Sequence, residues 1–314
     1  MSRRVVLLFA GQGAQKVGMG KDLAEAYPAA AQIFSEADSV LAMNLTEVMF
    51  EGPMETLTRT SYCQPALFVH GLVCLRLVQD RVPDLEIAAC AGLSLGEFTA
   101  HAAAGSFSFA DGLRLVAARG RFMDEACAQT DGAMAALIGG EAAGVLELAQ
   151  ECGIDVANFN APGQIVVSGT RTGVARAVER AKSKGIRAAK LLPVAGAYHS
   201  RLMRSAQQKL AAKLAPTEIH APRIPVVSNV TAQPVNDPAE IRRTLEDQVT
   251  GAVRWSDSME FLLAQGFGEF LELGPGGVLA GLMGRIDKSA EVTSVENVTG
   301  LDRLAGMFSQ VSER

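Results

Sequence analysis

Short, mainly apolar runs alternate with longer stretches of helical pattern along the chain. Val5–Phe9 and Leu85–Ala91 have the length and composition expected of buried strands. Pro65–Val78 is apolar nearly all round and predicts a helix buried on several sides, and Leu95–Ala104 predicts an alanine-rich helix. This alternation predicts an α/β fold in which helices cover a parallel sheet.

The pattern changes to shorter units between about residue 127 and residue 194. The predicted elements are Ala133–Ile138 (strand), Glu141–Cys152 (helix), Ile154–Asn158 and Gln164–Ser168 (strands), Gly173–Lys184 (helix) and Ala188–Pro193 (strand). This β-α-β-β-α-β order is typical of ferredoxin-like folds. The sequence therefore predicts a small subdomain over residues 127–196, inserted into a large subdomain formed by residues 1–126 and 197–314. The last residues, 302–314, are expected to be loosely held.

Composition and charge narrow the class of protein. The chain has 314 residues, 48% of them hydrophobic and 20% charged, as expected for a soluble globular protein. A net charge of -5 argues against general nucleic-acid binding. The five cysteines are scattered through apolar runs and indicate neither disulfides nor a zinc site, so no metal is expected. The first apolar run is too short for a signal segment or membrane span, and a cytoplasmic protein is expected.

The most informative motif is Gly92-Leu93-Ser94-Leu95-Gly96-Glu97, where a predicted strand meets a predicted helix. A serine with a glycine two residues away on each side is the arrangement of a nucleophile elbow, because the glycines let the backbone reverse sharply. The Ser94 hydroxyl would then lie at a helix N-terminus, where backbone amides favour developing negative charge. Small residues also occur in ordinary strand-to-helix connections, so this motif alone leaves both interpretations open.

A glycine-rich loop, Gly11–Gln15, follows the first predicted strand. It lacks the third glycine of G-x-G-x-x-G, and no G-x-x-x-x-G-K-S/T string runs through Gly18, Gly20 and Lys21. Two interpretations remain equally open. Either the loop presents backbone amides that form an oxyanion hole, or it is an ordinary connection.

A serine nucleophile needs a base, and the chain has four histidines. His70 lies in the apolar helix, and His101 lies two turns beyond Ser94, about 10 Å along the same helix. His220 lies in a stretch typical of an exposed connection. His199 follows the last strand of the small subdomain through small residues, where a subdomain junction would bring it to a cleft. Elimination favours His199.

Eight motifs in a fixed order give the chain a family resemblance. They are Phe9–Gln15, Gln64–Leu67, Gly92–Glu97, Arg119-Gly120, Asn158–Gln164, Gly196–Ser200, Val253–Trp255 and Leu273–Gly276. Each motif is modestly specific, but the ordered set, which extends to about Ile286, is very specific. The chain resembles the malonyl-CoA:acyl carrier protein transacylases of type II fatty acid synthesis.

The resemblance implies an α/β-hydrolase-like parallel-sheet core with a ferredoxin-like insertion. It also implies ping-pong chemistry, in which Ser94 attacks malonyl-CoA, His199 accepts the proton, and acyl carrier protein then receives the malonyl group on its phosphopantetheine thiol. The backbone amides of Gln12 and Leu95 would form the oxyanion hole, and the main-chain carbonyl of Gln248 would orient the imidazole. No cofactor is implied, because malonyl-CoA is a substrate and phosphopantetheine belongs to the partner.

Three further positions concern the acyl group. In the family, the arginine at the position of Arg119 pairs with the free carboxylate of malonate, which suits a guanidinium better than a lysine. Arg114 and Arg121, on the same stretch, are expected to be surface charges. Tyr198 takes the place of the commoner phenylalanine in a motif associated with malonyl units. Leu93 replaces the usual histidine beside the nucleophile, and since leucine cannot form hydrogen bonds, strict malonyl selectivity stays open.

The resemblance further implies an acidic partner, acyl carrier protein, a coenzyme A thioester as substrate, and a monomer that uses neither nucleic acid nor membrane. The basic residues expected near the cleft mouth are Lys182, Lys184, Arg187, Lys190, Arg201, Arg204, Arg285 and Lys288. Two other functions stay open: a free-standing acyltransferase of a polyketide synthase, and an acyl-thioester hydrolase with the same serine. Arg119 argues against the hydrolase, and the presence of both Ser94 and His199 argues against a non-catalytic carrier-binding scaffold.

Overall fold

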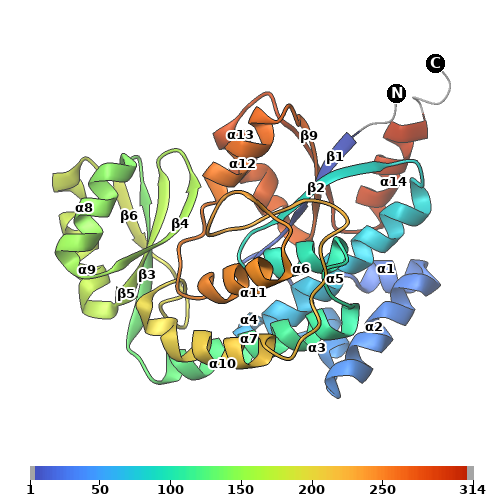
Figure 1. Cartoon of the computed structure of the whole chain (residues 1–314), viewed down its shortest axis with the longest axis horizontal. Coiled ribbons are helices and arrows are strands. Elements are labelled where there is room, and N and C mark those ends of the chain that lie inside the picture. The colour runs from blue at the N-terminus through green and yellow to red at the C-terminus, as the bar shows by residue number, and fades with distance from the viewer. Residues whose placement is uncertain (1–3, 310–314) are drawn as a thin grey trace.

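The computed structural model describes residues 4–309, whose centre is a six-stranded sheet in the order β10-β9-β1-β2-β7-β8 (Figure 1). The parallel strands are β1 (Arg4–Phe9), β2 (Glu86–Gly92), β7 (Val226–Val227), β9 (Glu269–Leu273) and β10 (Glu291–Val295). At one edge, β8 (Pro234–Val235) pairs antiparallel with β7. The two apolar runs of the sequence form β1 and β2, the central strands, and the predicted parallel sheet is confirmed.

Alternate side chains of β1 enter two hydrophobic clusters, one on each face of the sheet. Leu7 and Phe9 pack in the cluster that includes residues of α5 (Thr60–Arg81), α6 (Leu95–Ala103) and α7 (Phe109–Ala128). Val6 and Leu8 pack in the cluster formed with α12 (Trp255–Ala264) and α13 (Val278–Ile286). The remaining elements of this part are α1 (Lys21–Ala26), α2 (Pro28–Leu41), α3 (Leu45–Glu51), α4 (Met54–Thr58), α10 (Arg204–Leu214), α11 (Pro238–Asp247), α14 (Val298–Ser309), and the short 3-10 turns η2 (Arg201–Met203) and η3 (Pro275–Gly277).

Helix α5 begins at Thr60 rather than at the predicted Pro65, so the proline lies inside the helix. By length and composition α5 could cross a membrane, but 78% of its most apolar window is buried within the protein, and core helices pass the same test. The expectation of a helix buried on several sides is confirmed.

A second sheet forms a separate unit, which Figure 1 shows at the left of the molecule with α8 and α9 beside it. Its antiparallel strands lie in the order β4-β5-β3-β6. They are β3 (Gly132–Ile138), β4 (Asp155–Ala161), β5 (Gln164–Thr170) and β6 (Ala188–Leu191), with α8 (Ala142–Cys152), α9 (Arg171–Arg180) and the 3-10 turn η1 (Ala181–Lys184). This unit has its own hydrophobic cluster, which includes Leu137, Leu148 and Val167. The predicted sequence of strands and helices over this segment is confirmed.

The predicted looseness of residues 302–314 is wrong for the part that the structure describes. Residues 302–309 belong to α14, because Leu301 and Leu304 are fully buried in the main cluster and anchor the helix. Arg81 also forms an ion pair with Asp302 at 2.7 Å. Residues 310–314 lie outside the described residues. All five cysteines are free thiols, four of them buried and Cys127 half-buried.

Candidate active site

Ser94 occupies a strained turn between β2 and α6, with φ 54° and ψ -106°. The turn is possible only because the residues two positions away on each side, Gly92 and Gly96, have no side chains. A Cβ at Gly92 would lie 1.9 Å from the carbonyl carbon of Gly96, and a Cβ at Gly96 would lie 2.1 Å from the carbonyl oxygen of Phe9. A non-glycine residue keeps such backbone angles only where the surroundings enforce them, and such strain concentrates at functional sites. The structure therefore favours the nucleophile elbow over an ordinary connection.

We expect Gly96→Ala to destabilise the protein and to block acylation of Ser94. The added methyl group would push α6 away from β1, and overpacking of this kind costs about 1–3 kcal/mol or more. For a protein of this size that corresponds to a Tm lower by roughly 2–4 °C per kcal/mol, measurable by calorimetry. Gly281→Ala on α13 is the matched control, because no atom lies within 4 Å of the added Cβ. Wild-type Tm and acylation in Gly96→Ala would contradict the expectation.

The structure brings Ser94 and His199 into hydrogen-bond contact, with 2.8 Å between Ser94 Oγ and His199 Nε2. The other ring nitrogen, Nδ1, lies 2.8 Å from the main-chain carbonyl oxygen of Gln248. A carbonyl can only accept a hydrogen bond, so Nδ1 carries the proton and Nε2 is free to accept one from the serine. Burial, aided by the charge of Arg119, lowers the pKa of His199 to about 4. The imidazole is therefore neutral and able to act as a base at pH 7.

The other three histidines lie elsewhere, in keeping with the elimination argument. His70 is buried, with Nε2 at 3.1 Å from the carbonyl oxygen of Glu296. His101 is buried, with Nδ1 at 3.0 Å from Ser106 Oγ. The side chain of His220 is 60% exposed.

Arg119 lies on α7 with 1% of its surface exposed, and its guanidinium faces the nucleophile. One terminal nitrogen donates to Ser94 Oγ at 3.1 Å and to Gln248 Oε1 at 2.8 Å, and the other donates to Gln64 Oε1 at 2.7 Å. Its Nε has no partner among residues 4–309, and no carboxylate there lies within ion-pair distance. Burial lowers the pKa of Arg119 to about 10, so the group stays charged at pH 7. The charge of Glu97 acts on the guanidinium from a distance, but no carboxylate contacts it, which suits a site that receives one.

The other two arginines on α7 behave as the sequence predicts. Arg114 forms an exposed ion pair with Asp111 at 3.3 Å, and Arg121 forms one with Glu125 at 3.8 Å. Their side chains are 54% and 62% exposed.

The glycine-rich loop lies directly against the elbow. A Cβ at Gly11 would lie 2.4 Å from the carbonyl oxygen of Leu93, so this contact requires glycine. Gln12 follows it, and its side-chain amide donates to Thr60 Oγ1 at 3.3 Å. The backbone amides of Gln12 and Leu95 donate no hydrogen bond to any group in the described part of the chain. Free amides on both sides of the serine are what an oxyanion hole needs.

Tyr198 and Leu93 pack in different hydrophobic clusters, which lie on opposite faces of the central sheet. Tyr198 is 7% exposed in the main cluster, and its hydroxyl lies 2.8 Å from Thr60 Oγ1. Thr60 thus contacts both Tyr198 and the side chain of Gln12. Leu93 is half-buried against the cluster on the other face of the sheet, and its amide donates to the carbonyl oxygen of Phe9 at 3.1 Å.

Two residues without an assigned role in the sequence complete the cluster. Asn229 Oδ1 accepts from the Ser94 amide at 2.7 Å, and its Nδ2 donates to the carbonyl oxygen of Gly92 at 2.8 Å. Glu97 Oε2 accepts a hydrogen bond from the main-chain amide of Asn229 at 3.1 Å and another from Gln248 Nε2 at 2.5 Å. One signal could have found Asn229: it follows an apolar pair at the carboxyl end of a parallel strand, where sites form in such sheets. The strand, β7, has only two residues and gives too short a pattern.

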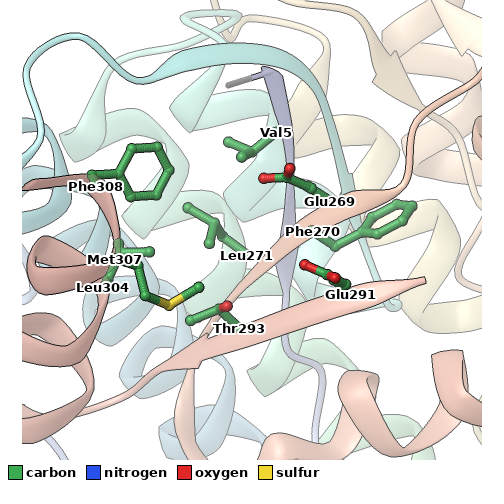
Figure 2. Close-up of a pocket in the computed structure, with 9 residues that line it drawn as sticks. All are labelled: Val5, Glu269, Phe270, Leu271, Glu291, Thr293, Leu304, Met307 and Phe308. Atoms are coloured by element: carbon green, nitrogen blue, oxygen red, sulfur yellow. The ribbon is translucent and has the colours of Figure 1, made fainter. Parts of the chain in front are cut away.

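Two surface hollows of the described part of the chain lie away from this cluster. Figure 2 shows one between β9, β10 and α14, whose lining residues are Val5, Glu269, Phe270, Leu271, Glu291, Thr293, Leu304, Met307 and Phe308. A second is lined by Lys16, Gly18, Met19, Gly20, Lys21, Asp22, Glu25, Glu296 and Asn297. Neither contains Ser94 or a residue bonded to it. The candidate site is instead a nearly closed polar cluster, in which Ser94 is 9% exposed and His199 is 4% exposed.

Comparison with known proteins identifies the class. Residues 6–309 match the acyl transferase domain family. The chain is 40% identical over 301 residues to malonyl CoA-acyl carrier protein transacylase of Bacillus subtilis, covering 94% of each chain. It therefore belongs to the acyl transferase family, among the malonyl CoA-acyl carrier protein transacylases, and the family resemblance in the sequence is confirmed.

Solved structures agree with this assignment. The acyl-carrier-protein-S-malonyltransferase of Bartonella henselae has a TM-score of 0.92 and 38% identity, over 98% of this chain and 100% of that one. A malonyl-transacylase in complex with a holo acyl-carrier protein of a type II PKS has a TM-score of 0.93 and 36% identity, over 97% of this chain and 99% of that one. The α/β architecture, with a parallel core sheet and a small antiparallel sheet, is shared with these enzymes.

Proposed function

We propose that this protein transfers the malonyl group from malonyl-CoA to the phosphopantetheine thiol of acyl carrier protein, through a malonyl ester of Ser94. One observation carries the proposal. A buried guanidinium without a carboxylate partner, that of Arg119, lies 3.1 Å from a serine hydroxyl that already contacts a neutral histidine. A nucleophile beside a cation that no carboxylate contacts fits an acyl group that bears its own carboxylate.

In the first half-reaction, Ser94 Oγ attacks the thioester carbonyl carbon, and its proton passes to His199 Nε2. The carbonyl oxygen becomes an oxyanion, to which the free amides of Gln12 and Leu95 donate. The carbon–sulfur bond then breaks, and the proton on His199 passes to the departing thiolate of coenzyme A. The carbonyl of Gln248 stabilises the transient imidazolium through Nδ1, in the place of an aspartate.

In the second half-reaction, the carrier thiol gives its proton to His199, and the thiolate attacks the ester carbon. The ester bond breaks, Ser94 takes the proton back, and the malonyl group leaves as a thioester of the carrier. Every nucleophile, base and donor in both steps is a group of the two proteins, so we propose that no cofactor or metal takes part. The two half-reactions share one site, which gives ping-pong kinetics.

We propose that Tyr198 and Leu93 line the acyl pocket. The hydroxyl of Tyr198 is held by Thr60, so the tyrosine can fill the place of the family's phenylalanine without leaving a buried polar group unpaired. Leu93 offers no hydrogen bond to a carboxylate, so selectivity for malonyl depends on Arg119.

We propose that acyl carrier protein docks on the basic residues near the small subdomain. Of the eight basic residues considered, three have polar partners: Lys184 with Glu147 and Glu151, Arg201 with Asp155, and Arg285 with Gln164. The other five, for which residues 4–309 provide no ion pair, are the stronger candidates: Lys182, Arg187, Lys190, Arg204 and Lys288. Charge complementarity of this kind favours rapid, transient association. We also propose that the protein is a cytoplasmic monomer.

Two finer features of the fold are part of the proposal. We assign an α/β-hydrolase-like core to residues 1–126 and 197–314, because a nucleophile elbow follows a central parallel strand. We assign a ferredoxin-like subdomain to residues 127–196, supported by the order β4-β5-β3-β6. The first boundary falls in the last turn of α7, which ends at Ala128.

The two alternatives have less support. A polyketide synthase acyltransferase would use the same residues. One structural relative is bound to a type II PKS acyl-carrier protein, so this alternative differs from the main proposal only in the carrier. A thioester hydrolase has no use for a buried cation beside its acyl group, and Arg119 argues against it.

We expect the purified protein to form a covalent adduct with malonyl-CoA and to pass it to holo acyl carrier protein. Intact mass would show the malonyl adduct within seconds, little adduct with acetyl-CoA, and loss of the adduct when the carrier is added. Malonyl-CoA is favoured over acetyl-CoA because only malonyl has a free carboxylate that can pair with Arg119. Hydrolysis of the thioester at the same rate with and without carrier would instead support the hydrolase.

A further inference from the structure

Among the described residues, Glu97 provides the one carboxylate in the polar cluster around Ser94. Its main-chain amide donates to the Ser94 carbonyl oxygen at 3.1 Å, but its carboxylate contacts neither the serine nor the histidine. It is fully buried on the first turn of α6. Its Oε2 accepts two hydrogen bonds, from the main-chain amide of Asn229 at 3.1 Å and from the side-chain Nε2 of Gln248 at 2.5 Å. Its Oε1 has no partner among residues 4–309. A buried carboxylate is costly, so its presence here needs an explanation.

Both partners of Glu97 hold the strained turn. Asn229 joins the Gly92 carbonyl to the Ser94 amide, with contacts of 2.8 and 2.7 Å. Gln248 Nε2 donates to the Ser94 carbonyl oxygen at 2.8 Å. The backbone of Ser94 is therefore held at its amide by the side chain of Asn229 and at its carbonyl by the side chain of Gln248. Both residues also donate to Glu97, Asn229 through its main-chain amide and Gln248 through Nε2. Strained backbone angles persist only when such surrounding contacts enforce them.

Gln248 also links Glu97 to Arg119 and His199. Its Oε1 accepts from Arg119 at 2.8 Å, and its main-chain oxygen accepts from His199 Nδ1 at 2.8 Å. The carboxylate, together with the Ser94 carbonyl oxygen, fixes which way the amide of Gln248 points: the NH₂ group faces these two acceptors, so the oxygen faces Arg119. Reversal of that amide would place NH₂ against a guanidinium and oxygen against a carboxylate.

We propose that Glu97 is a positioning residue for acyl transfer: its ionised carboxylate orders Asn229 and Gln248, which together hold Ser94, His199 and Arg119 in their relative positions. It contacts no reacting atom and exchanges no proton with substrate. The inference rests on the proposed malonyl transfer, because it assumes that acylation of Ser94 is the step being supported.

The surroundings of Glu97 determine the pH at which this support is lost. Burial raises the pKa of Glu97 to about 7, opposed by the polar groups of Gln248, Asn229 and Ser228 and by the charge of Arg119. Arg119 on α7 is the charged group that acts on it. His199, whose pKa is about 4, and His101, further along α6 with a pKa of about 3, are both neutral near pH 7. Protonation turns an acceptor oxygen into a donor and removes the charge that orders Gln248.

The test is the pH dependence of single-turnover acylation at saturating malonyl-CoA, followed by intact mass. In the wild type we expect the rate to fall about tenfold per pH unit below about pH 7, since the ionised fraction of Glu97 falls by that factor. In Glu97→Gln we expect a lower plateau, by up to about 100-fold, because small misplacement of reacting groups has that effect. In this variant the acylation rate should no longer fall near pH 7. It should fall only near pH 4, where His199 becomes protonated.

Glu272→Gln on β9 is the matched control. Glu272 is also fully buried and accepts from the Leu279 and Ala280 amides and from Ser294 Oγ, but it lies outside the cluster around Ser94. We expect it to lower Tm while leaving the pH profile of acylation unchanged. Asn229→Ala is a second variant, expected to lower the rate while keeping the wild-type acid limb.

Three outcomes separate the hypotheses. A wild-type rate that is flat from pH 5 to pH 8 overturns the inference without any variant. A Glu97→Gln profile that keeps the limb near pH 7 also overturns it, even if the variant is unstable, because the titrating group must then be another. A wild type that forms no malonyl adduct at any pH overturns the proposed function instead.

Discussion

Ser94→Ala is expected to abolish the malonyl adduct and to reduce transfer to acyl carrier protein by at least roughly 10⁴-fold. The side chain removed is the only hydroxyl that contacts His199, at 2.8 Å, among the described residues. No second nucleophile is placed there, because the half-buried thiol of Cys127 lies beside Tyr198 and burial raises its pKa to about 11. Intact mass and a carrier-transfer assay would measure both effects.

The fold should survive this substitution, which makes the loss of activity diagnostic. Alanine is smaller than serine, and the backbone of residue 94 keeps its bonds to Asn229 and Gln248. Ser168→Ala is the matched control: Ser168 on β5 is fully buried, and its hydroxyl has no partner among residues 4–309. We expect that control to acylate at the wild-type rate. A malonyl adduct that persists in Ser94→Ala would place the nucleophile elsewhere.

The elements that the sequence predicts best are those with a local pattern. β1 and β2 are apolar runs, and the segment over residues 132–191 alternates short strands with amphipathic helices, so the bounds agree within a few residues. α5 is harder, because Pro65 resembles a helix start and lies inside the helix. α14 is harder still. Its order comes from Leu301 and Leu304, which are buried only because β10 and α5 lie beside them.

The candidate site divides in the same way. The motif around Ser94 raised the nucleophile elbow as one interpretation, because its glycines are local, but it left an ordinary connection open. His199 was a choice among four, and the contact with Gln248 that fixes its tautomer joins residues 49 positions apart in sequence. Asn229 lies 135 positions from Ser94 and has no local pattern that points to the elbow. Long-range hydrogen bonds of this kind depend on the three-dimensional order of the strands, which a single sequence does not display.

The role of Arg119 was implied by the family resemblance alone, because its position on α7 does not distinguish it from Arg114 and Arg121 in the sequence. Burial separates it from its neighbours on that helix. Arg119 is 1% exposed and has no acidic partner among residues 4–309, whereas Arg114 and Arg121 are exposed and paired with acids. A buried charge that no carboxylate contacts is costly, and this cost is what makes the arginine informative.

Arg119→Ala is expected to reduce kcat/KM for malonyl-CoA by about 10²- to 10⁴-fold, because truncating one partner of a buried charge pair costs about 3–5 kcal/mol. The rate with acetyl-CoA, which has no carboxylate, should fall much less, so the preference for malonyl is lost. Arg121→Ala is the matched control on the same helix, since that side chain is exposed and its ion pair with Glu125 is long. Both thioesters would be compared by initial acylation rates.

Two results would distinguish carboxylate binding from a general effect on the serine. Arg119 Nη2 also donates to Ser94 Oγ at 3.1 Å, so an equal loss with malonyl-CoA and acetyl-CoA would mean that it acts on the nucleophile. The charge of Arg119 also helps to lower the pKa of His199, so its removal should move the limb near pH 4 upward. Arg119→Lys should keep that limb near its wild-type position, because the charge remains, while the loss of the planar guanidinium still weakens malonyl binding. A cation that acts only through its charge would instead be replaced by lysine without loss.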